Sequence, residues 1–292
     1  MNRTAEHIEP SVADLLGTGS ETIGDASDTP ELDARVLLQT LLKRDHAWLI
    51  AHAAEPVEPE DARRFYGWIR RRSKSEPIAY ITGRKEFWSL DLIVTPDVLV
   101  PRPETELLVQ HALDRIPLSE AVTVADLGTG SGAIALAVAG ERPLCKVIAT
   151  DVSRAALTLA ERNKARLGLR NIDFKQGDWY EPLGQERFSV IVCNPPYVPN
   201  SHYAAALSYE PRHALFAGNR GLEALKVVIG GAAEHLERSG WLLVEHGYDH
   251  GDDVRSLFAS TNLESIETHG DTAGLPRVTQ GRRRRTAGST IG

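Results

Sequence analysis

The sequence VTVADLGTGSG (residues 122–132) places a run of β-forming residues directly before three glycines at alternate positions. Valine and threonine favour a strand, whereas glycine lets the backbone turn sharply and approach a ligand without a Cβ atom in the way. Residues 134–139 continue as an apolar helical segment. A strand that ends in such a turn and opens a helix leaves N–H groups at the helix start free. The stretch therefore predicts a strand–turn–helix unit with a binding site at the turn.

The same alternation of strand and helix patterns continues downstream. Expected strands cover residues 146–150, 172–175, 188–192 and 241–245, and expected helices cover residues 155–167, 222–236 and 252–258. Strands that alternate with helices are typical of a mostly parallel sheet with helices on both faces. We therefore predict an α/β fold with a doubly wound, Rossmann-like sheet.

The first 84 residues differ from the rest because they contain only helical patterns. Thr29-Pro30-Glu31 has the features of a helix start, and Pro59-Glu60-Asp61 begins another. This region has no residue spacing that suggests a catalytic site. We expect a small all-helical domain that serves recognition or support.

A β-hairpin is predicted between the helical region and the sheet. Residues 86–94 and 98–100 are rich in β-formers, and Thr95-Pro96-Asp97 separates them. The expected division is therefore a helical substrate-recognition domain (residues 1–84), a hairpin linker (85–104), a catalytic domain (105–285) and a flexible tail (286–292).

The composition is that of an ordinary globular protein, with 42% hydrophobic and 25% charged residues among 292. The net charge of −7 argues against broad binding to nucleic acid. Cys145 and Cys193 lie in apolar sequence, which fits buried thiols in a reducing compartment. Neither a signal peptide nor a membrane-length apolar run is evident, so we expect a cytoplasmic protein. The run Arg282–Arg285 is expected to be a solvated, frayed end, with binding of ribosomal RNA or another acidic partner as the alternative.

An acidic residue follows the second expected strand. Asp151 lies roughly twenty residues beyond the glycine turn, where an acidic side chain can bind ribose hydroxyls. Trp179, after the third expected strand, can wall an adenine ring unless it is a core residue. These residues indicate an adenosine-type cofactor. Its identity stays open, because Gly128, Gly130 and Ala133 also fit the dinucleotide fingerprint of nicotinamide enzymes.

The segment Asn194-Pro195-Pro196-Tyr197 follows the fourth expected strand. Proline cannot donate to a sheet ladder, so the strand should end at Asn194, where α/β sheets bind ligands. The Asn194 side-chain oxygen and the Pro195 carbonyl can accept both N–H groups of a planar NH2, and Tyr197 can stack on its plane. An amide or aryl NH2 is a poor nucleophile, so positioning and desolvation would drive its reaction. The segment predicts a site that presents an NH2 group to an electrophile.

Other polar residues give weaker signals. His246 and His250 have i,i+4 spacing, but no third ligand is evident, so we expect no metal site. Arg102, between two prolines, either anchors an interdomain hinge or approaches a cofactor carboxylate. Glu245, at a strand end, is expected to be structural.

Together, the glycine turn, Asp151 and the Asn194–Tyr197 segment resemble class I S-adenosylmethionine-dependent methyltransferases. The Asn-Pro-Pro-Tyr sequence alone is shared by DNA adenine N6-methyltransferases and protein glutamine N5-methyltransferases. The motifs that decide between them are residues 80–88, 100–106, 245–247 and 277–279, which closely resemble the HemK/PrmC family. The resemblance extends from about Pro30 to Arg282.

The resemblance implies direct, in-line transfer of a methyl group from S-adenosylmethionine, which becomes S-adenosylhomocysteine. The acceptor would be the glutamine of the Gly-Gly-Gln motif in peptide chain release factors, and the enzyme would act as a monomer. The residues implied to bind the cofactor are Gly128, Thr129, Gly130, Ser131, Gly132, Asp151, Trp179 and Asn194. Those implied to bind substrate are Asn194, Pro195, Pro196, Tyr197 and Phe87, with Asn194, Pro195 and Tyr197 as the catalytic set.

One part of the chain departs from the family pattern. The segment after Tyr197 is shorter, and Ser208-Tyr209-Glu210-Pro211 stands where the family has Arg-Phe-Glu-Pro. The missing arginine affects an expected contact near the substrate entry.

Three other functions stay open. A nucleic-acid adenine N6-methyltransferase shares the Asn-Pro-Pro-Tyr segment, although the acidic net charge and the helical N-terminal region argue against it. A nicotinamide-dependent enzyme fits the glycine turn. A binding module that has lost catalysis fits the fold, although the site residues are intact.

Overall fold

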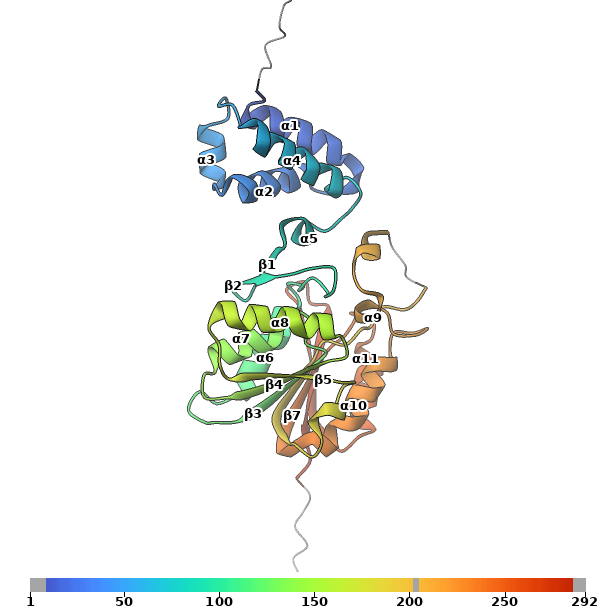
Figure 1. Cartoon of the computed structure of the whole chain (residues 1–292). Coiled ribbons are helices and arrows are strands. Elements are labelled where there is room, and N and C mark those ends of the chain that lie inside the picture. Colours follow the sequence, from blue (N-terminus) through green and yellow to red (C-terminus); the bar gives the residue numbers. More distant parts are fainter. Residues whose placement is uncertain (1–8, 202–204, 286–292) are drawn as a thin grey trace, which may run out of the picture. The chain divides into compact units, whose positions relative to one another are not determined.

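The computed structural model describes residues 9–201 and 205–285 (Figure 1). The chain divides into two compact units. The first unit runs to Gly83 and also includes Ala205–Tyr209, and the second unit contains the remaining residues from Arg84 onward. The predicted tail, residues 286–292, lies outside the described residues. In the described part, no helix has both the length and the apolar composition needed to cross a membrane.

The first unit is helical, as predicted. Its helices are α1 (Val12–Ile23), α2 (Pro30–Leu42), α3 (His46–Ala51), α4 (Pro59–Arg72) and α5 (Ile78–Thr82), with 3₁₀ turns at Gly24–Ala26 and Ala205–Tyr209. Pro30 and Pro59 each stand at a helix start, where the missing N–H costs no hydrogen bond. Leu38 and Phe65 belong to the buried core that joins these helices. Arg72 also pairs with the carboxylate of Asp33 at 2.6 Å, which links α4 to α2.

The second unit begins with a hairpin that is shorter than predicted. β1 (Arg84–Phe87) pairs antiparallel with β2 (Leu90–Ile93), and Trp88 and Ser89 form the turn with φ angles of 51° and 58°. The predicted strand at residues 98–100 is wrong, since this segment forms no strand. Prolines on both sides of it cannot donate to a ladder. The Val100 N–H instead donates to the Glu210 carboxylate at 3.1 Å.

A seven-stranded sheet forms the centre of the second unit, in the order β5-β4-β3-β6-β7-β9-β8. The strands are β3 (Thr123–Leu127), β4 (Lys146–Asp151), β5 (Ile172–Gln176), β6 (Phe188–Cys193), β7 (Leu236–Glu245), β8 (Leu263–Gly270) and β9 (Pro276–Arg283). β3 to β7 pair in parallel, as the alternating pattern predicted. β9 runs antiparallel to β7 and β8.

The arginine run is not the frayed end that its composition suggested. Arg282 and Arg283 belong to β9, which the sequence did not indicate as a strand. Arg282 donates to Glu264 at 3.0 Å, and the Arg283 guanidinium donates to the Leu236 carbonyl. β8 and β9 are rich in polar residues, so they lack the apolar run that marks a buried strand.

Helices cover both faces of the sheet. Those on one face are α6 (Thr105–Arg115), α7 (Ala133–Glu141) and α8 (Arg154–Leu167), and those on the other are α10 (Glu223–His235) and α11 (Gly251–Ala259). Figure 1 shows α7 and α8 across the sheet from α10 and α11. Val124 and Ala125, adjacent in β3, contribute to the two opposite cores. A short helix, α9 (Arg212–Leu215), and a 3₁₀ turn at Glu181–Leu183 lie in the connections.

The strand order brings together the segments that the sequence marked as functional. β3 lies between β4 and β6 in a parallel arrangement, so the carboxyl ends of all three meet at one edge. In doubly wound sheets, ligands bind outside this edge, where the connections diverge to opposite faces.

A buried asparagine of α8 fastens the hairpin and the glycine turn to the sheet. The Asn163 side chain is 1% exposed. It accepts from the Ile93 N–H at 2.8 Å and donates to the carbonyls of Ile93 and Ser131 at 3.0 and 2.9 Å. One side chain therefore satisfies three backbone groups, two at the end of β2 and one in the glycine turn.

We predict that Asn163→Ala lowers the free energy of unfolding by about 2–3 kcal/mol, because it leaves buried backbone groups without partners. Urea unfolding measures the change. The matched control is Thr158→Ala on the exposed face of the same helix, which should stay within about 0.5 kcal/mol of wild type. Equal losses in the two variants would contradict this role for Asn163.

Candidate active site

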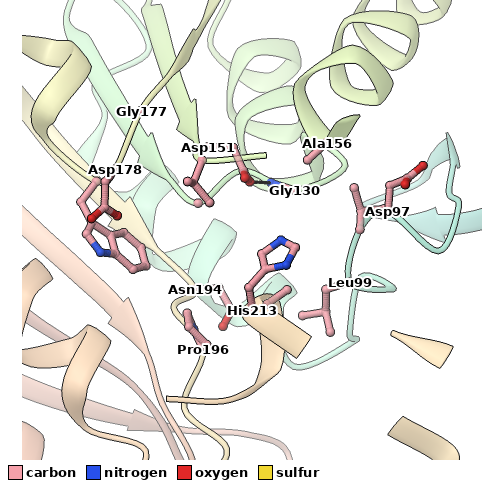
Figure 2. A pocket seen from close by; sticks show the side chains of 15 residues that line it. Asp97, Leu99, Gly130, Asp151, Ala156, Gly177, Asp178, Asn194, Pro196 and His213 are labelled. Atoms are coloured by element: carbon pink, nitrogen blue, oxygen red, sulfur yellow. Dashed lines mark hydrogen bonds between the residues drawn. The ribbon is translucent and has the colours of Figure 1, made fainter. Parts of the chain in front are cut away.

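A cavity of about 220 Å³ opens at the carboxyl edge of the sheet. Its walls come from the turns after β3 to β6, from residues 97–99 and from the starts of α8 and α9. The residues that line it are Asp97, Val98, Leu99, Gly128, Gly130, Asp151, Val152, Ala156, Gly177, Asp178, Trp179, Asn194, Pro196, His213 and Ala214. Figure 2 shows Gly130 and Asp151 on one side of the opening and Asn194 and Pro196 on the other. All of these residues belong to the second unit.

The glycine turn needs its glycines for two different reasons. Gly128, Gly130 and Gly132 have φ angles of 73°, 56° and 86°, a region that side chains rarely adopt. A Cβ atom on Gly132 would lie 2.9 Å from the Leu136 side chain, so this glycine allows α7 to pack. A Cβ atom on Gly130 would meet no atom within 4 Å, so its backbone borders the open cavity. Thr129 and Ser131 are buried and do not line the cavity.

Asp151 is fixed at the end of β4 by two backbone donors. The Gly130 N–H donates to Oδ2 and the Ser153 N–H to Oδ1, both at 2.8 Å. Each carboxylate oxygen keeps a second lone pair. Asp151 therefore presents fixed acceptors inside the cavity and also links the turn after β3 to the end of β4.

Asp126 supports the glycine turn from inside the protein. Its Oδ2 accepts from the Thr129 hydroxyl at 2.6 Å and from the Ala135 N–H at 3.2 Å, whereas its buried Oδ1 has no protein partner. The pKa of Asp126 is raised to about 7, mainly by burial and to a smaller extent by the charge of Asp151, although the two hydrogen bonds act to lower it. Asp126 was not among the predicted site residues.

Trp179 forms a wall of the cavity next to the glycine turn. A Cβ atom on Gly128 would lie 3.4 Å from the Trp179 ring. The Trp179 carbonyl accepts a hydrogen bond from the Thr150 hydroxyl at 3.1 Å. The residue itself has a φ angle of 44°, which is uncommon for a residue with a side chain. The half-buried indole thus has a face available to a flat ligand.

The Asn194–Tyr197 turn contributes two of its residues to the cavity. Asn194 and Pro196 line it, but Pro195 and Tyr197 do not. Asn194 Nδ2 donates to the Thr105 hydroxyl at 3.0 Å, and the Tyr197 hydroxyl donates to Glu245 at 3.0 Å.

A glycine packs directly against this turn. Gly221 has a φ angle of 72°, and a Cβ atom there would lie 2.1 Å from the Tyr197 carbonyl oxygen. Gly221 was not among the predicted site residues, because its close approach to Tyr197 is a tertiary contact.

Thr105 and Glu245 form the layer behind the turn. Glu245 was expected to be structural, and Thr105 was named only within the family motif at residues 100–106. Thr105 is 4% exposed and Glu245 is 1% exposed. The pKa of Glu245 is raised to about 7 by burial, although Thr105 and the hydrogen bond from Tyr197 act to lower it. Its Oε2 is buried without a protein partner.

Other predicted site residues lie away from the cavity. Phe87 is 1% exposed in the core with Leu92 and Leu108, because the residue ends β1 with its ring turned inward. The structure therefore does not bring it to the cavity with Asn194. His246 is buried and bonds to Thr279 and to the Gly247 carbonyl. Among the described residues, no group of three or more His, Cys, Asp or Glu side chains is arranged to hold a metal.

Arg102 pairs with a carboxylate in its own unit. Its guanidinium pairs with the Glu210 carboxylate at 2.5 Å, and the same carboxylate accepts from the Val100 N–H. Both partners lie in the second unit. Glu210, from the segment that departs from the family pattern, therefore anchors the chain that continues from the cavity wall at residues 97–99.

The charges around the cavity suit a cofactor with positive charge. Asp97, Asp151 and Asp178 line it, and no lysine or arginine is among its described lining residues. A pyrophosphate would meet carboxylates without a compensating side-chain cation, which argues against a nicotinamide dinucleotide. Fixed carboxylate acceptors, an aromatic wall and a bare glycine backbone fit an adenosine group with a cationic sulfur, as in S-adenosylmethionine.

We predict that Asp126→Asn flattens the pH dependence of stability. The pKa of Asp126 is about 7 in the folded protein and 3.8 as a free side chain, so the folded state binds an extra proton between these values. This proton stabilises the folded protein at low pH, and the stabilisation is lost as the pH rises toward 7. The loss is up to about 1.4 kcal/mol for each unit by which the folded-state pKa exceeds the pKa of the free side chain.

Urea unfolding at about pH 5 and about pH 8 brackets most of this interval. The matched control is Asp173→Asn, at an exposed carboxylate of β5. If wild type and Asp126→Asn lost equal stability between the two pH values, the buried proton would be ruled out.

Two regions of the chain match known families. Residues 14–83 match the PrmC N-terminal domain, and residues 103–218 match the methyltransferase small domain. A solved methyltransferase from Pyrococcus furiosus shares the fold, with a TM-score of 0.51 and 19% identity over 67% of this chain and 90% of that chain.

Curated relatives match nearly the full length. The chain is 45% identical over 274 residues to the release factor glutamine methyltransferase of Coxiella burnetii, which covers 94% of this chain and 99% of the relative. It is 39% identical over 260 residues to the Escherichia coli protein of the same name, and the match covers 88% of this chain and 94% of the relative. The family resemblance inferred from the sequence motifs is thereby confirmed, and the chain belongs to the release factor glutamine methyltransferase family.

Proposed function

We propose that this chain methylates the side-chain amide nitrogen of the glutamine in the Gly-Gly-Gln motif of peptide chain release factors. It is an S-adenosylmethionine-dependent protein-glutamine methyltransferase. One observation carries the proposal: Asn194 and Pro196 line the same cavity as Gly130 and Asp151. An amide-binding turn therefore faces a nucleoside-binding turn across one opening. The names of the relatives favour a protein amide over a nucleic-acid adenine as the methyl acceptor.

The cofactor would be held by the residues around the glycine turn. Asp151 would accept the ribose hydroxyls, and the Trp179 ring would lie against the adenine. The remaining contacts would come from the turn Gly128–Gly132, with Asn194 beside the methyl group. S-adenosylmethionine supplies a methyl group on a positively charged sulfur.

The protein's own task is to orient a weak nucleophile. The lone pair of an amide nitrogen is delocalised into its carbonyl, so the nitrogen attacks poorly. The Asn194 Oδ1, which lines the cavity, would accept one of its N–H groups and fix the nitrogen near the methyl group. The Pro195 backbone carbonyl, next in the chain but outside the cavity lining, would accept the other N–H group once the substrate is bound. Pro196 would exclude water on the same side. Positioning and desolvation of this kind can account for large rate gains without a strong base.

The remaining assignments concern the chain as a whole. The N-terminal domain, residues 1–84, would bind the release factor away from its Gly-Gly-Gln loop, with residues 85–104 as linker and residues 105–285 as catalytic domain. The enzyme would act as a monomer in the cytoplasm, where its substrate factors work. The absence of lysine and arginine among the described cavity-lining residues supports a protein partner over a nucleic acid.

The direct test is incubation of purified protein with methyl-labelled S-adenosylmethionine and a purified release factor. We expect one methyl group on the glutamine of the Gly-Gly-Gln motif, located by peptide mass spectrometry. A factor with this glutamine replaced by alanine is the control. Absence of label from the wild-type factor would overturn the proposal, and label on DNA alone would favour the adenine alternative.

We predict that Asn194→Ala lowers kcat by at least about a hundredfold, because the amide nitrogen loses the acceptor that orients it. The affinity for S-adenosylmethionine, measured by calorimetry, should change little. Normal turnover in this variant would contradict the assigned geometry.

We predict the opposite pattern for Asp151→Ala. Loss of hydrogen bonds to a charged acceptor costs about 1.5–3 kcal/mol, so the Kd for S-adenosylmethionine should rise by about ten- to a hundredfold. Calorimetry without release factor measures this directly. An unchanged Kd would remove Asp151 from the ribose site.

A further inference from the structure

The Asn194 side chain lies over two buried polar side chains, Thr105 and Glu245. Its Nδ2 donates to the Thr105 hydroxyl at 3.0 Å, and the Tyr197 hydroxyl donates to Glu245 Oε1 at 3.0 Å. Thr105 is close enough to the Glu245 carboxyl to lower its pKa, and Glu245 Oε2 is buried without a hydrogen-bond partner. This carboxyl group, at the end of β7, can therefore receive the hydrogen of the Thr105 hydroxyl.

The orientation of the Asn194 amide decides what the cavity offers to a ligand. Oδ1 is an acceptor and Nδ2 is a donor, although the two ends have nearly the same shape. A substrate amide nitrogen carries two N–H donors, so it can bind Oδ1 but would face Nδ2 donor to donor. Some neighbouring group must therefore keep Nδ2 turned away.

Thr105 alone cannot set this orientation, because a hydroxyl can donate as well as accept. An ionised carboxylate only accepts. When Thr105 gives its single hydrogen to Glu245, the Thr105 oxygen is left as an acceptor for Asn194 Nδ2. Without the carboxylate, Thr105 could donate to Asn194 Oδ1 instead, and the amide could rotate.

We propose that Glu245 is a positioning residue that acts through Thr105 to keep Oδ1 of Asn194 facing the substrate amide. This inference rests on the proposed function, because a substrate NH2 is what requires an acceptor at this point. Tyr197 donates to the same carboxyl, so Glu245 fixes both ends of the turn together.

The surroundings of Glu245 give this arrangement a pH dependence. The pKa of Glu245 is raised to about 7, mainly by burial and also by the nearby Glu104, against the lowering effects of Thr105, Tyr197 and the charge of Arg277. The accepting carboxylate therefore predominates above about pH 7. In wild type, kcat should rise as the pH rises through about 7. In a variant without the carboxyl group, this rise in kcat should be absent.

The central variant is Glu245→Gln, which keeps the shape and removes the charge. We expect kcat to fall by about ten- to a hundredfold, while the KM for release factor and the Kd for S-adenosylmethionine stay close to wild type. The melting temperature should not fall, because a buried carboxyl with a raised pKa is replaced by a neutral group. The matched control is Glu237→Gln, an exposed carboxylate on the same strand.

A second pair of variants tests the intermediate link. Thr105→Val removes the hydroxyl while keeping the shape, and it should lower kcat to a similar extent. Thr105→Ser retains the hydroxyl and should restore most of the activity. If Thr105→Ser lost as much as Thr105→Val, the effect would come from packing and the proposal would fail.

A measurement that needs no turnover separates this inference from the proposed function. The Asn194 side-chain NH2 can be observed by ¹H–¹⁵N NMR and assigned through its loss in Asn194→Ala. In wild type, one Nδ2 proton should exchange slowly because it bonds to Thr105, and in Glu245→Gln it should exchange faster. Unchanged exchange would overturn the positioning role, whereas the expected change without any methylation of release factor would overturn only the proposed function.

Discussion

Each of the two functional turns rests on a carboxyl group buried beneath it. Asp126 accepts from Thr129 and from the start of α7 under the glycine turn, and Glu245 accepts from Tyr197 under the turn that contains Asn194. Burying a carboxyl group is unfavourable, and the pKa of about 7 for each group reflects this cost. In its ionised form such a group only accepts, so the donors around it can adopt a single arrangement. The rigidity of the cavity depends on that constraint.

The parallel sheet places these two supports at one edge. Asp126 lies in β3 and Glu245 ends β7, with β6 between the two strands. Asp151, at the end of β4, then joins the glycine turn through the Gly130 N–H. The cavity is thus held by hydrogen bonds that cross from strand to strand. Buried networks of this kind strengthen each bond and leave few alternative conformations.

The sequence alone was sufficient to predict the position of a residue in the fold where that position depends on nearby residues in the chain. The glycine turn, Asp151 and the Asn194–Tyr197 segment each follow a strand that its own apolar pattern reveals. The positions of Thr105 and Glu245 behind the Asn194–Tyr197 turn were not predicted, because they depend on contacts with residues far along the chain. Thr105 meets Asn194 across 89 positions, and Arg102 meets Glu210 across 108. β8, β9 and the turn at Trp88–Ser89 were missed for a related reason, since tertiary pairing outweighs their weak local propensities.

The use of asparagine at position 194, instead of aspartate, follows from the charges nearby. An aspartate would offer two acceptors and need no orienting neighbour. It would, however, add a carboxylate close to Glu245, and mutual repulsion would raise the pKa of one member of the pair until it held a proton. A protonated carboxyl group donates, which would oppose an incoming NH2. Asparagine avoids the extra charge but has a donor end that must be turned away, and this requirement accounts for a buried threonine and a buried glutamate behind a neutral side chain.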